Sequence, residues 1–232
     1  MKRLVVLTGA GISAESGIKT FRDADGLWEG HDIMEVASPE GFKANPELVL
    51  DFYNQRRRQL LKVKPNKAHL NLVLLKKHFD VKIITQNVDN LHEKAGSTNI
   101  THLHGELLKA RSSVDESLVL NWEKDLILGD LCKYNSQLRP HIVWFEEMVP
   151  MLDKAIEIVQ KADILVIIGT SMKVYPASSL INYTKHNIPI YFIDPNPSIY
   201  KNDFNNLTVI KKEASLGTDE LIRLLKLRNL KN

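Results

Sequence analysis

The sequence is poor in cysteine and in long apolar runs. Its single cysteine, Cys132, excludes an internal disulfide and is typical of proteins from a reducing compartment. The longest apolar stretch, residues 164–168, is far shorter than the roughly 20 residues that a membrane span needs. The apolar run after Arg3 is only about nine residues long and leads into Gly-rich and charged sequence, not a cleavage site. We therefore predict a cytoplasmic protein that does not bind membranes.

An excess of one charge is also missing. The chain has 31 basic and 28 acidic residues, a net charge of +3, which gives no electrostatic reason to expect direct nucleic-acid binding. With 44% hydrophobic and 25% charged residues the composition is that of a folded globular protein. The length of 232 residues suits one large α/β domain with a smaller excursion.

Short runs rich in Val and Ile alternate with helical patterns. The predicted strands are 3–7, 81–85, 164–168, 188–193 and 207–210. The predicted helices are 47–61, 67–78, 152–161, 176–186 and 218–227. This alternation indicates a Rossmann-like α/β fold with a doubly wound parallel sheet. Two insertions, about 23–65 and 106–145, are predicted to form a smaller second lobe, leaving about 1–22, 66–105 and 146–232 for the large lobe.

A glycine-rich turn follows the first predicted strand. Gly9, Gly11 and Ala14 fit G-x-G-x-x-(G/A), a pattern in which the backbone approaches a pyrophosphate and a helix packs closely on a strand. The same glycines could form a plain tight turn, and the ribose-binding acid expected about 20 residues later is not obvious.

Polar segments also follow later strands. Residues 86–89 follow the second strand and 169–171 follow the third, so the carboxyl ends of the strands should bring them together with the glycine turn. Thr170 or Ser171 could instead cap a helix. Residues 194–197, Asp-Pro-Asn-Pro, could likewise be a simple turn.

Three side chains, two of them in residues 86–89, suit chemistry on a bound molecule. Asn87 and Asp89 alternate with Val88, so both can face one cavity, although Asn and Asp also cap loops. Alternation places His102 and His104 on one face with Leu103 on the other. Imidazole is the side chain best suited to take a proton near neutral pH, but a lone histidine is more often structural.

Four blocks, in order, resemble the sirtuins, the NAD-dependent protein lysine deacylases. They are GAG-I-S-x-x-SGI followed by FR at 9–22, TQNVDNLH at 85–92, HGE at 104–106 and GTS at 169–171. The resemblance runs from about residue 2 to about residue 225. It implies an enzyme that uses NAD as a co-substrate, removes acyl groups from lysine side chains of proteins or peptides, transfers them to ADP-ribose and releases nicotinamide.

The resemblance also implies residue roles. His104 would be the general base on the nicotinamide ribose, and Asn87 would share the catalytic site. Phe21 and Arg22 resemble residues of a loop that closes over NAD, and Asn196 is the candidate for the adenosine ribose. The full expected NAD-binding set is Gly9, Ala10, Gly11, Ser13, Ala14, Phe21, Arg22, Trp28, Gln86, Asn87, Asp89, Gly169, Thr170, Ser171, Asn196 and Ala214.

A pair of residues on the helix predicted at 47–61 points to the acyl group. Tyr53 and Arg56 are three apart and so are neighbours on one face, where a guanidinium fork and a phenol suit a carboxylate. Tyr-x-x-Arg resembles the subgroup that removes succinyl, malonyl or glutaryl groups, often with weaker deacetylation. Alternatively Arg56, Arg57 and Arg58 form a solvated run with Tyr53 in the core, or Arg57 is the carboxylate ligand.

Residues 142–145 resemble the segment on which the substrate peptide pairs as an added strand, with Val143 and Phe145 as substrate contacts. They could equally be an ordinary buried strand. Glu146 stands where the family usually has glycine, which weakens the prediction of peptide docking there.

The family's two Cys-x-x-Cys pairs for zinc are missing. This part of the chain offers Cys132 and His141 with only Asp, Glu and Ser around them, and structural zinc wants four ligands, mostly thiolate and imidazole. We predict no zinc. We expect burial to stabilise the lobe instead, through Leu118, Val119, Leu120, Trp122, Leu126, Ile127, Leu128 and Leu131.

Other functions could use the same cleft. An ADP-ribosyltransferase or NAD hydrolase would share the NAD-binding residues without needing an acyl pocket, and a non-catalytic NAD sensor would not need His104. A Rossmann dehydrogenase is the outside alternative.

Overall fold

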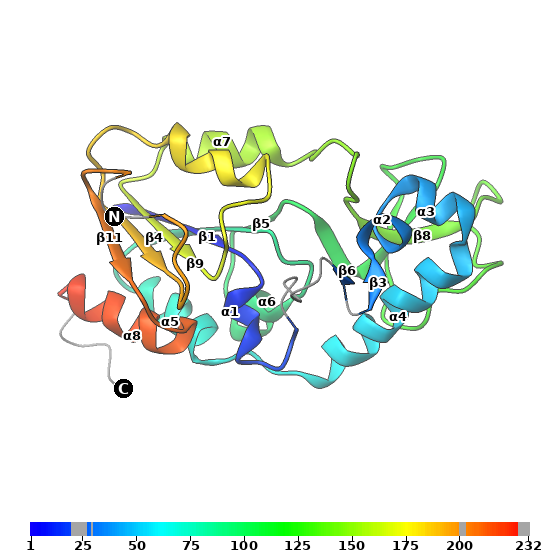
Figure 1. Cartoon of the computed structure of the whole chain (residues 1–232), viewed down its shortest axis with the longest axis horizontal. Coiled ribbons are helices and arrows are strands. Elements are labelled where there is room, and N and C mark those ends of the chain that lie inside the picture. The colour runs from blue at the N-terminus through cyan, green and yellow to red at the C-terminus, as the bar shows by residue number, and fades with distance from the viewer. Residues whose placement is uncertain (20–26, 29, 200–202, 227–232) are drawn as a thin grey trace.

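The centre of the molecule is a parallel sheet. A computed structural model describes residues 1–19, 27–28, 30–199 and 203–226, with 27–28 described by their backbone. Within these residues six strands lie in the order β11-β10-β9-β1-β4-β5, all parallel. Their bounds are β1 Arg3–Thr8, β4 Asp80–Thr85, β5 Ile100–His102, β9 Ile164–Ile168, β10 Ile190–Ile193 and β11 Leu207–Ile210. The sheet occupies the left part of Figure 1.

The order of the strands defines where a ligand is expected. From β1 the chain moves outward through β4 to β5, and then returns to the other side of β1 and moves outward from β9 to β11. The direction therefore reverses between β1 and β9. In open α/β sheets this reversal opens a crevice beyond the carboxyl ends of the strands.

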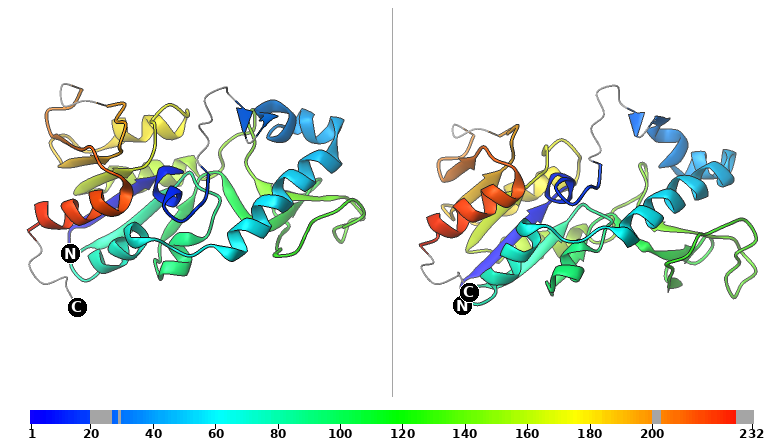
Figure 2. Two further views of the ribbon diagram at one scale, coloured as in Figure 1. Left: turned by 60° about the horizontal axis from the view of Figure 1, so that its bottom comes forward. Right: turned by 90° about the horizontal axis from the view of Figure 1, so that it is seen from below.

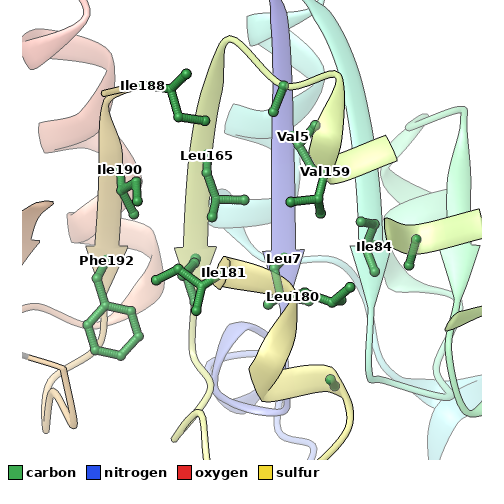
Figure 3. Packing of buried hydrophobic residues seen from close by; sticks show 14 of the residues in the cluster. Val5, Leu7, Ile84, Val159, Leu165, Leu180, Ile181, Ile188, Ile190 and Phe192 are labelled. Atoms are coloured by element: carbon green, nitrogen blue, oxygen red, sulfur yellow. The ribbon is translucent and has the colours of Figure 1, made fainter. Parts of the chain in front are cut away.

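Alternation along the strands builds two apolar layers. Leu4 and Val6 face helices α5 (Lys67–Leu75) and α8 (Ala214–Leu224). Val5 and Leu7 face the opposite layer, made by α7 (Leu152–Gln160) and the 3₁₀ helix η1 (Ala177–Tyr183). Figure 3 shows this second layer, in which side chains of α7 and η1 meet those of the strands. Each large side chain fully buried here contributes roughly 1.5–3 kcal/mol, so the two layers fix the strand ends.

A second lobe stands beside the sheet. It contains α2 (Ile33–Val36), α3 (Pro39–Ala44), the long α4 (Pro46–Lys62) and an antiparallel sheet of order β7-β6-β8. These strands are β6 Gly105–Ser112, β7 Val119–Asn121 and β8 Leu138–Ile142. Figure 2 shows in both views that this lobe extends away from the parallel sheet. The predicted fold class is thus confirmed, whereas the lobe boundaries stay a prediction.

Four short elements complete the described part of the fold. They are α1 (Gly11–Ala14), β2 (Leu27–Trp28), β3 (His31–Asp32) and α6 (Leu91–Ala95). β2 and β3 pair with each other in an antiparallel ribbon.

Several predicted elements need correction. The helix predicted at 176–186 is the 3₁₀ helix η1, in a segment rich in Ser, Asn, Tyr and Thr, which are weaker helix formers. The helix predicted to begin at Thr218 begins at Ala214, and that predicted to end at His78 ends at Leu75. The buried strand considered for 142–145 ends at Ile142.

The expected burial of residues 118–131 is wrong for half of the eight residues named. Leu126 is fully buried, with Leu118 and Trp122 packed partly against the same cluster, but Leu120, Ile127, Leu128 and Leu131 are exposed. The segment is instead held by Asn54 of α4, whose amide nitrogen donates to the Leu126 carbonyl and whose amide oxygen accepts from the Leu126 N–H. One buried amide thus satisfies both backbone groups of Leu126.

Cys132 does not lie in a metal cluster among the described residues, where no group of three or more His, Cys, Asp or Glu side chains comes together. Its sulfur lies 3.3 Å from the Ser112 hydroxyl and accepts from the Tyr134 N–H.

In the described part of the chain no helix combines the length and the apolar character that crossing a membrane requires.

Candidate active site

Two glycine turns meet where the sheet reverses direction. The Gly11 N–H donates to the Gly169 carbonyl at 2.8 Å, and the Gly9 N–H donates to the Ile168 carbonyl at 3.0 Å. A Cβ on Gly11 would lie 2.6 Å from the Gly169 Cα, and Gly169 itself has φ +62°. Only glycine allows this approach together with a left-handed backbone. The turns after β1 and β9 therefore form one backbone platform at the crevice.

The loop after β4 is fixed to this platform. Gln86 donates to the Thr170 hydroxyl at 3.0 Å, and its N–H donates to the Thr8 carbonyl. Thr170 also accepts from the Met172 N–H, and no helix follows until η1, so the helix-capping alternative for 169–171 is wrong.

Asn87 and Asp89 meet at Ser13. The Ser13 hydroxyl donates to the Asp89 carboxylate at 2.9 Å and accepts from the Asn87 amide at 3.2 Å. The other Asp89 oxygen accepts from the Leu91 N–H. Burial raises the pKa of Asp89, while these two hydrogen bonds oppose the shift. A carboxamide and a carboxylate thus share one hydroxyl at the base of the crevice, which fixes the orientation of both.

His104 is held by one ring nitrogen. Its Nδ1 lies 3.0 Å from the Gln86 carbonyl oxygen. Because a carbonyl only accepts, Nδ1 carries the proton, and the neutral ring keeps its lone pair on Nε2. Burial lowers the pKa of His104, which favours the neutral ring. This arrangement suits a general base.

The other histidines nearby have different partners. His102 lies with Nδ1 3.1 Å from the Asn87 carbonyl and Nε2 2.8 Å from the Glu93 carboxylate. Burial disfavours its charge, but the Glu93 carboxylate and the Asn87 carbonyl outweigh this and raise its pKa. His92 is fully buried, with Nε2 3.1 Å from the Thr8 hydroxyl, and burial lowers its pKa well below the usual range. His102 and His92 therefore support the loop.

Helix α4 brings Tyr53 and Arg56 to the crevice from the small lobe. Arg56 donates from Nη1 to the Phe52 carbonyl at 2.7 Å, and its guanidinium carbon lies 3.2 Å from the centre of the Phe52 ring. Arg57 points elsewhere: it is fully buried and donates to the Leu107 carbonyl and the Asn54 amide oxygen. Of the two arginines considered, Arg56 lines the crevice together with Tyr53.

The chain after β8 also borders the crevice, next to α4. The Val143 N–H donates to the His104 carbonyl and the Phe145 N–H to the Ala37 carbonyl. Glu146 is exposed and has φ +70°, a backbone region that favours glycine. Glu147 accepts from Arg139, from Arg111 and from the Trp144 N–H.

These segments enclose a cavity of about 900 Å³ between the two lobes. Eighteen of the predicted site residues line it: Gly9, Ala10, Gly11, Ser13, Ala14, Tyr53, Arg56, Gln86, Asn87, Asp89, His104, Val143, Phe145, Gly169, Thr170, Ser171, Asn196 and Ala214. Phe21, Arg22 and the Trp28 side chain lie outside the described residues.

Among the lining residues that sequence reasoning missed, two are buried and have side chains that can hydrogen-bond. Asp194, at the end of β10, is buried, and its carboxylate accepts from the Asn196 N–H. Trp144, between two predicted substrate contacts, is also buried and lines the cavity. The position of Asp194 directly after a predicted strand was a usable signal, whereas an indole between apolar residues was not.

The lining fits a dinucleotide. The volume lies at the upper end of the usual range for ligand pockets, about 300–1,000 Å³. Polar groups converge from the carboxyl ends of β1, β4, β9 and β10, and the first turn of α8 adds helix-terminal N–H groups near Ala214. Gln86 and Asn87 supply carboxamides, and Ser13 and Thr170 supply hydroxyls, so donors and acceptors for ribose, phosphate and nicotinamide are all present.

Known proteins share this architecture. The model of the Sir2 family matches residues 9–176. An NAD-dependent protein deacylase of Helicobacter pylori is 68% identical over 195 residues, covering 84% of this chain and 85% of that protein. One of Bacteroides thetaiotaomicron is 52% identical over 231 residues, covering 97% and 98%.

Solved structures agree. A complex of a Sir2 homologue with NAD has a TM-score of 0.86 at 39% identity, covering 97% of this chain and 90% of that chain. A Sir2 mutant bound to a p53 peptide and NAD has a TM-score of 0.79 at 28% identity, covering 97% and 93%. Sequence motifs, strand order and crevice thus lead to one conclusion: this chain belongs to the Sir2 family.

Proposed function

We propose that this Sir2-family protein removes from lysine side chains acyl groups that end in a carboxylate, succinyl and malonyl above all, besides acetyl. The family makes it an NAD-dependent protein deacylase with NAD as co-substrate, and the proposal adds the acyl class and the residue roles. Bound NAD supplies a glycosidic bond whose cleavage releases nicotinamide and an ADP-ribose that takes the acyl group.

His104 acts as the general base. Its protonated Nδ1 is held by the Gln86 carbonyl, so Nε2 carries the lone pair that accepts a proton from a ribose hydroxyl. Burial lowers its pKa and keeps the ring neutral before the reaction.

Asn87 and Asp89 bind the nicotinamide end. The Asn87 amide nitrogen donates to the Ser13 hydroxyl, and that hydroxyl donates to the Asp89 carboxylate. The Asn87 amide oxygen is left to accept from a donor of the ligand. The buried site also limits the access of water, which would otherwise compete with the lysine amide for the ribose.

The observation that carries the acyl class is the pair of α4 side chains at the cavity. Tyr53 and Arg56 line the same cavity as His104, and both lie on the small lobe, opposite the NAD loops. A phenol and a guanidinium match the two oxygens of a carboxylate. An acetyl group has no atom to meet them, so their presence favours an acid-ended chain.

Mass spectrometry of matched peptides tests the proposal. Acetyl-, succinyl- and malonyl-lysine versions of one peptide are incubated with the enzyme, with and without NAD. We expect NAD-dependent loss of the acyl group together with O-acyl-ADP-ribose, and a higher kcat/KM for the acidic groups. NAD consumption without any peptide product would instead indicate a hydrolase or an ADP-ribosyltransferase.

A further inference from the structure

Three consecutive carbonyls of the loop after β4 are held by the chain segment that runs through β5 and β6. The Gln86 carbonyl accepts from Nδ1 of His104, and the Val88 carbonyl accepts from a backbone N–H of β6 at 2.8 Å. Between them, Nδ1 of His102 lies 3.1 Å from the Asn87 carbonyl oxygen. The position of the loop backbone therefore depends on two imidazole rings.

Both ring nitrogens of His102 face acceptors. Nδ1 faces the Asn87 carbonyl, and Nε2 lies 2.8 Å from the carboxylate of Glu93 on α6. A carbonyl and an ionised carboxylate accept hydrogen bonds and donate none, so each ring nitrogen must carry a proton for both contacts to be hydrogen bonds. The form of the ring that satisfies both is the imidazolium cation.

The surroundings of His102 favour this positive charge. Its side chain is 8% exposed, and burial alone would disfavour the cation, but Glu93, a backbone carbonyl and Glu106 of β6 outweigh burial and raise its pKa. Burial raises the pKa of Asp89, and the nearby His102 charge opposes that shift. Burial also holds the pKa of His92 well below its usual range, so His92 adds no second positive charge.

We propose that Glu93 and His102 are positioning residues for the reaction with NAD: the Glu93 carboxylate keeps the His102 ring doubly protonated, and the ring holds the Asn87 carbonyl and with it the side chains of the loop. The inference rests on the proposed function, in which Asn87 and Asp89 bind the nicotinamide end. It adds two residues that lie outside the expected NAD-binding set.

A neutral His102 ring would not keep both contacts. It has one ring proton, so one nitrogen would direct its lone pair at an acceptor, and that contact would become repulsive. A carboxylate is a stronger acceptor than a carbonyl, so the proton stays with Glu93 and the Asn87 carbonyl is released. The hold on the loop is therefore present below the raised pKa of His102 and is lost as the pH rises through it.

Kinetics of the full-length enzyme against pH test this role. An acetyl-lysine peptide is deacetylated at varied NAD concentration by the wild type and by Glu93→Gln, in which the amide oxygen still accepts from Nε2 but the charge is gone. We expect kcat/KM for NAD to fall on the alkaline side of the wild-type profile. In Glu93→Gln this fall should begin at lower pH, and between the two midpoints the variant should be about tenfold less efficient, the worth of one hydrogen bond to a charged group.

Two further readouts separate positioning from stability. The inhibition constant of nicotinamide, which needs the same loop and no acyl group, should rise together with KM for NAD, whereas KM for the peptide should not change. Glu157→Gln, at an exposed carboxylate on α7, is the matched control and should leave the whole pH profile unchanged.

Nuclear magnetic resonance of the enzyme labelled with ¹⁵N-histidine observes the ring without any ligand. Ring nitrogen shifts distinguish protonated from unprotonated nitrogens, and the signals of His102 are assigned by their absence in His102→Gln. At pH 6.5 we expect both nitrogens of His102 to be protonated in most molecules. Glu93→Gln should make the ring lose its proton at lower pH.

The outcomes separate the two claims. A His102 ring that is mainly neutral at pH 6.5, or a Glu93→Gln enzyme that is slower by the same factor at every pH, would overturn the positioning role alone. A wild-type enzyme that never deacetylates the peptide with NAD would overturn the proposed function, and the inference with it.

Discussion

The Nδ1 atom of His104 lies 3.0 Å from the carbonyl oxygen of Gln86. Gln86, which directly follows β4, therefore belongs to the loop expected to hold NAD and also fixes the tautomer of the His104 imidazole. His102 makes the parallel contact with the Asn87 carbonyl, but its other nitrogen is used by Glu93. The two histidines therefore differ in the partner of Nε2, which in His102 is the Glu93 carboxylate.

Replacing His104 should slow catalysis strongly. Because a positioned general base contributes about 10²–10⁴-fold, we expect His104→Asn to lower kcat for deacylation by that factor, measured by mass spectrometry of an acyl peptide. His78→Asn, at an exposed histidine on the surface, is the matched control and should retain full activity. Undiminished deacylation by His104→Asn would exclude the assigned role.

The pH dependence of kcat/KM should reflect the buried imidazole. Burial lowers the pKa of His104 below 6.5, and the base must be neutral to act. The acid limb of the profile should therefore be centred below 6.5, where the ring becomes protonated. The measurement is kcat/KM against pH with the enzyme's stability checked at each point, and an acid limb centred above 6.5 would contradict the assignment.

The three consecutive arginines of α4 should differ sharply. Arg56→Met should raise KM for the succinyl peptide about tenfold or more, since hydrogen bonds to charged groups are worth roughly 1.5–3 kcal/mol, with a smaller effect on the acetyl peptide. Arg58→Met is the control, because Arg58 is half exposed and pairs with Asp51 and Asp125.

Arg57→Met should instead lower the free energy of unfolding in urea, because it leaves the Leu107 carbonyl and the Asn54 amide without their buried donor. A succinyl-specific KM effect at Arg57 and none at Arg56 would reverse the assignment of the two residues.

Gly11→Ala should damage the platform between β1 and β9. The new Cβ would lie 2.6 Å from the Gly169 Cα, so the two turns must separate. We expect the free energy of unfolding to fall by about 1–3 kcal/mol and the KM for NAD to rise. Gly129→Ala is the control: its φ of +93° is unfavourable for alanine, but no atom lies within 4 Å of the new Cβ. This control should leave the KM for NAD unchanged, and equal NAD affinity in both variants would refute the steric argument.

Glu147→Gln should destabilise the fold. The carboxylate accepts from Arg111 and Arg139, and its loss leaves two largely buried cations without their partner. Breaking a buried pair of this kind costs about 3–5 kcal/mol, which urea unfolding followed by circular dichroism can measure. Glu116→Gln, at an exposed carboxylate, should change stability by less than about 0.5 kcal/mol, and an equal effect there would show that the cluster adds nothing.

The parallel sheet was predictable because its strands carry a strong local signal. Runs such as Ile164–Ile168 are apolar at every position, as buried parallel strands are. β5 was missed because it has only three residues, two of them Thr and His. The 3₁₀ character of η1 and the hold of Asn54 on Leu126 depend on tertiary contacts that no local pattern contains.

The candidate site, too, was predictable only in part from the sequence. Residues that follow strands, such as Gly9, Asn87 and Thr170, could be placed in one crevice from topology alone. Topology alone could not predict whether Arg56 or Arg57 faces the cavity, because adjacent helical positions differ by about 100° and only packing decides which side chain is buried. The sequence did not indicate a role for Trp144, because its hydrogen-bond partner, the Tyr53 hydroxyl, is 91 positions away.

Tyr53 and Arg56 stand on α4, whereas the glycine turns and the Gln86–Asp89 loop belong to the other half of the molecule. In the proposed function, the residues of the reaction and those that choose the acyl group are therefore encoded in separate stretches of the gene. The proposal implies that a few codon changes within one helical turn would alter the acyl group that such an enzyme prefers, while the residues expected to bind NAD stay the same.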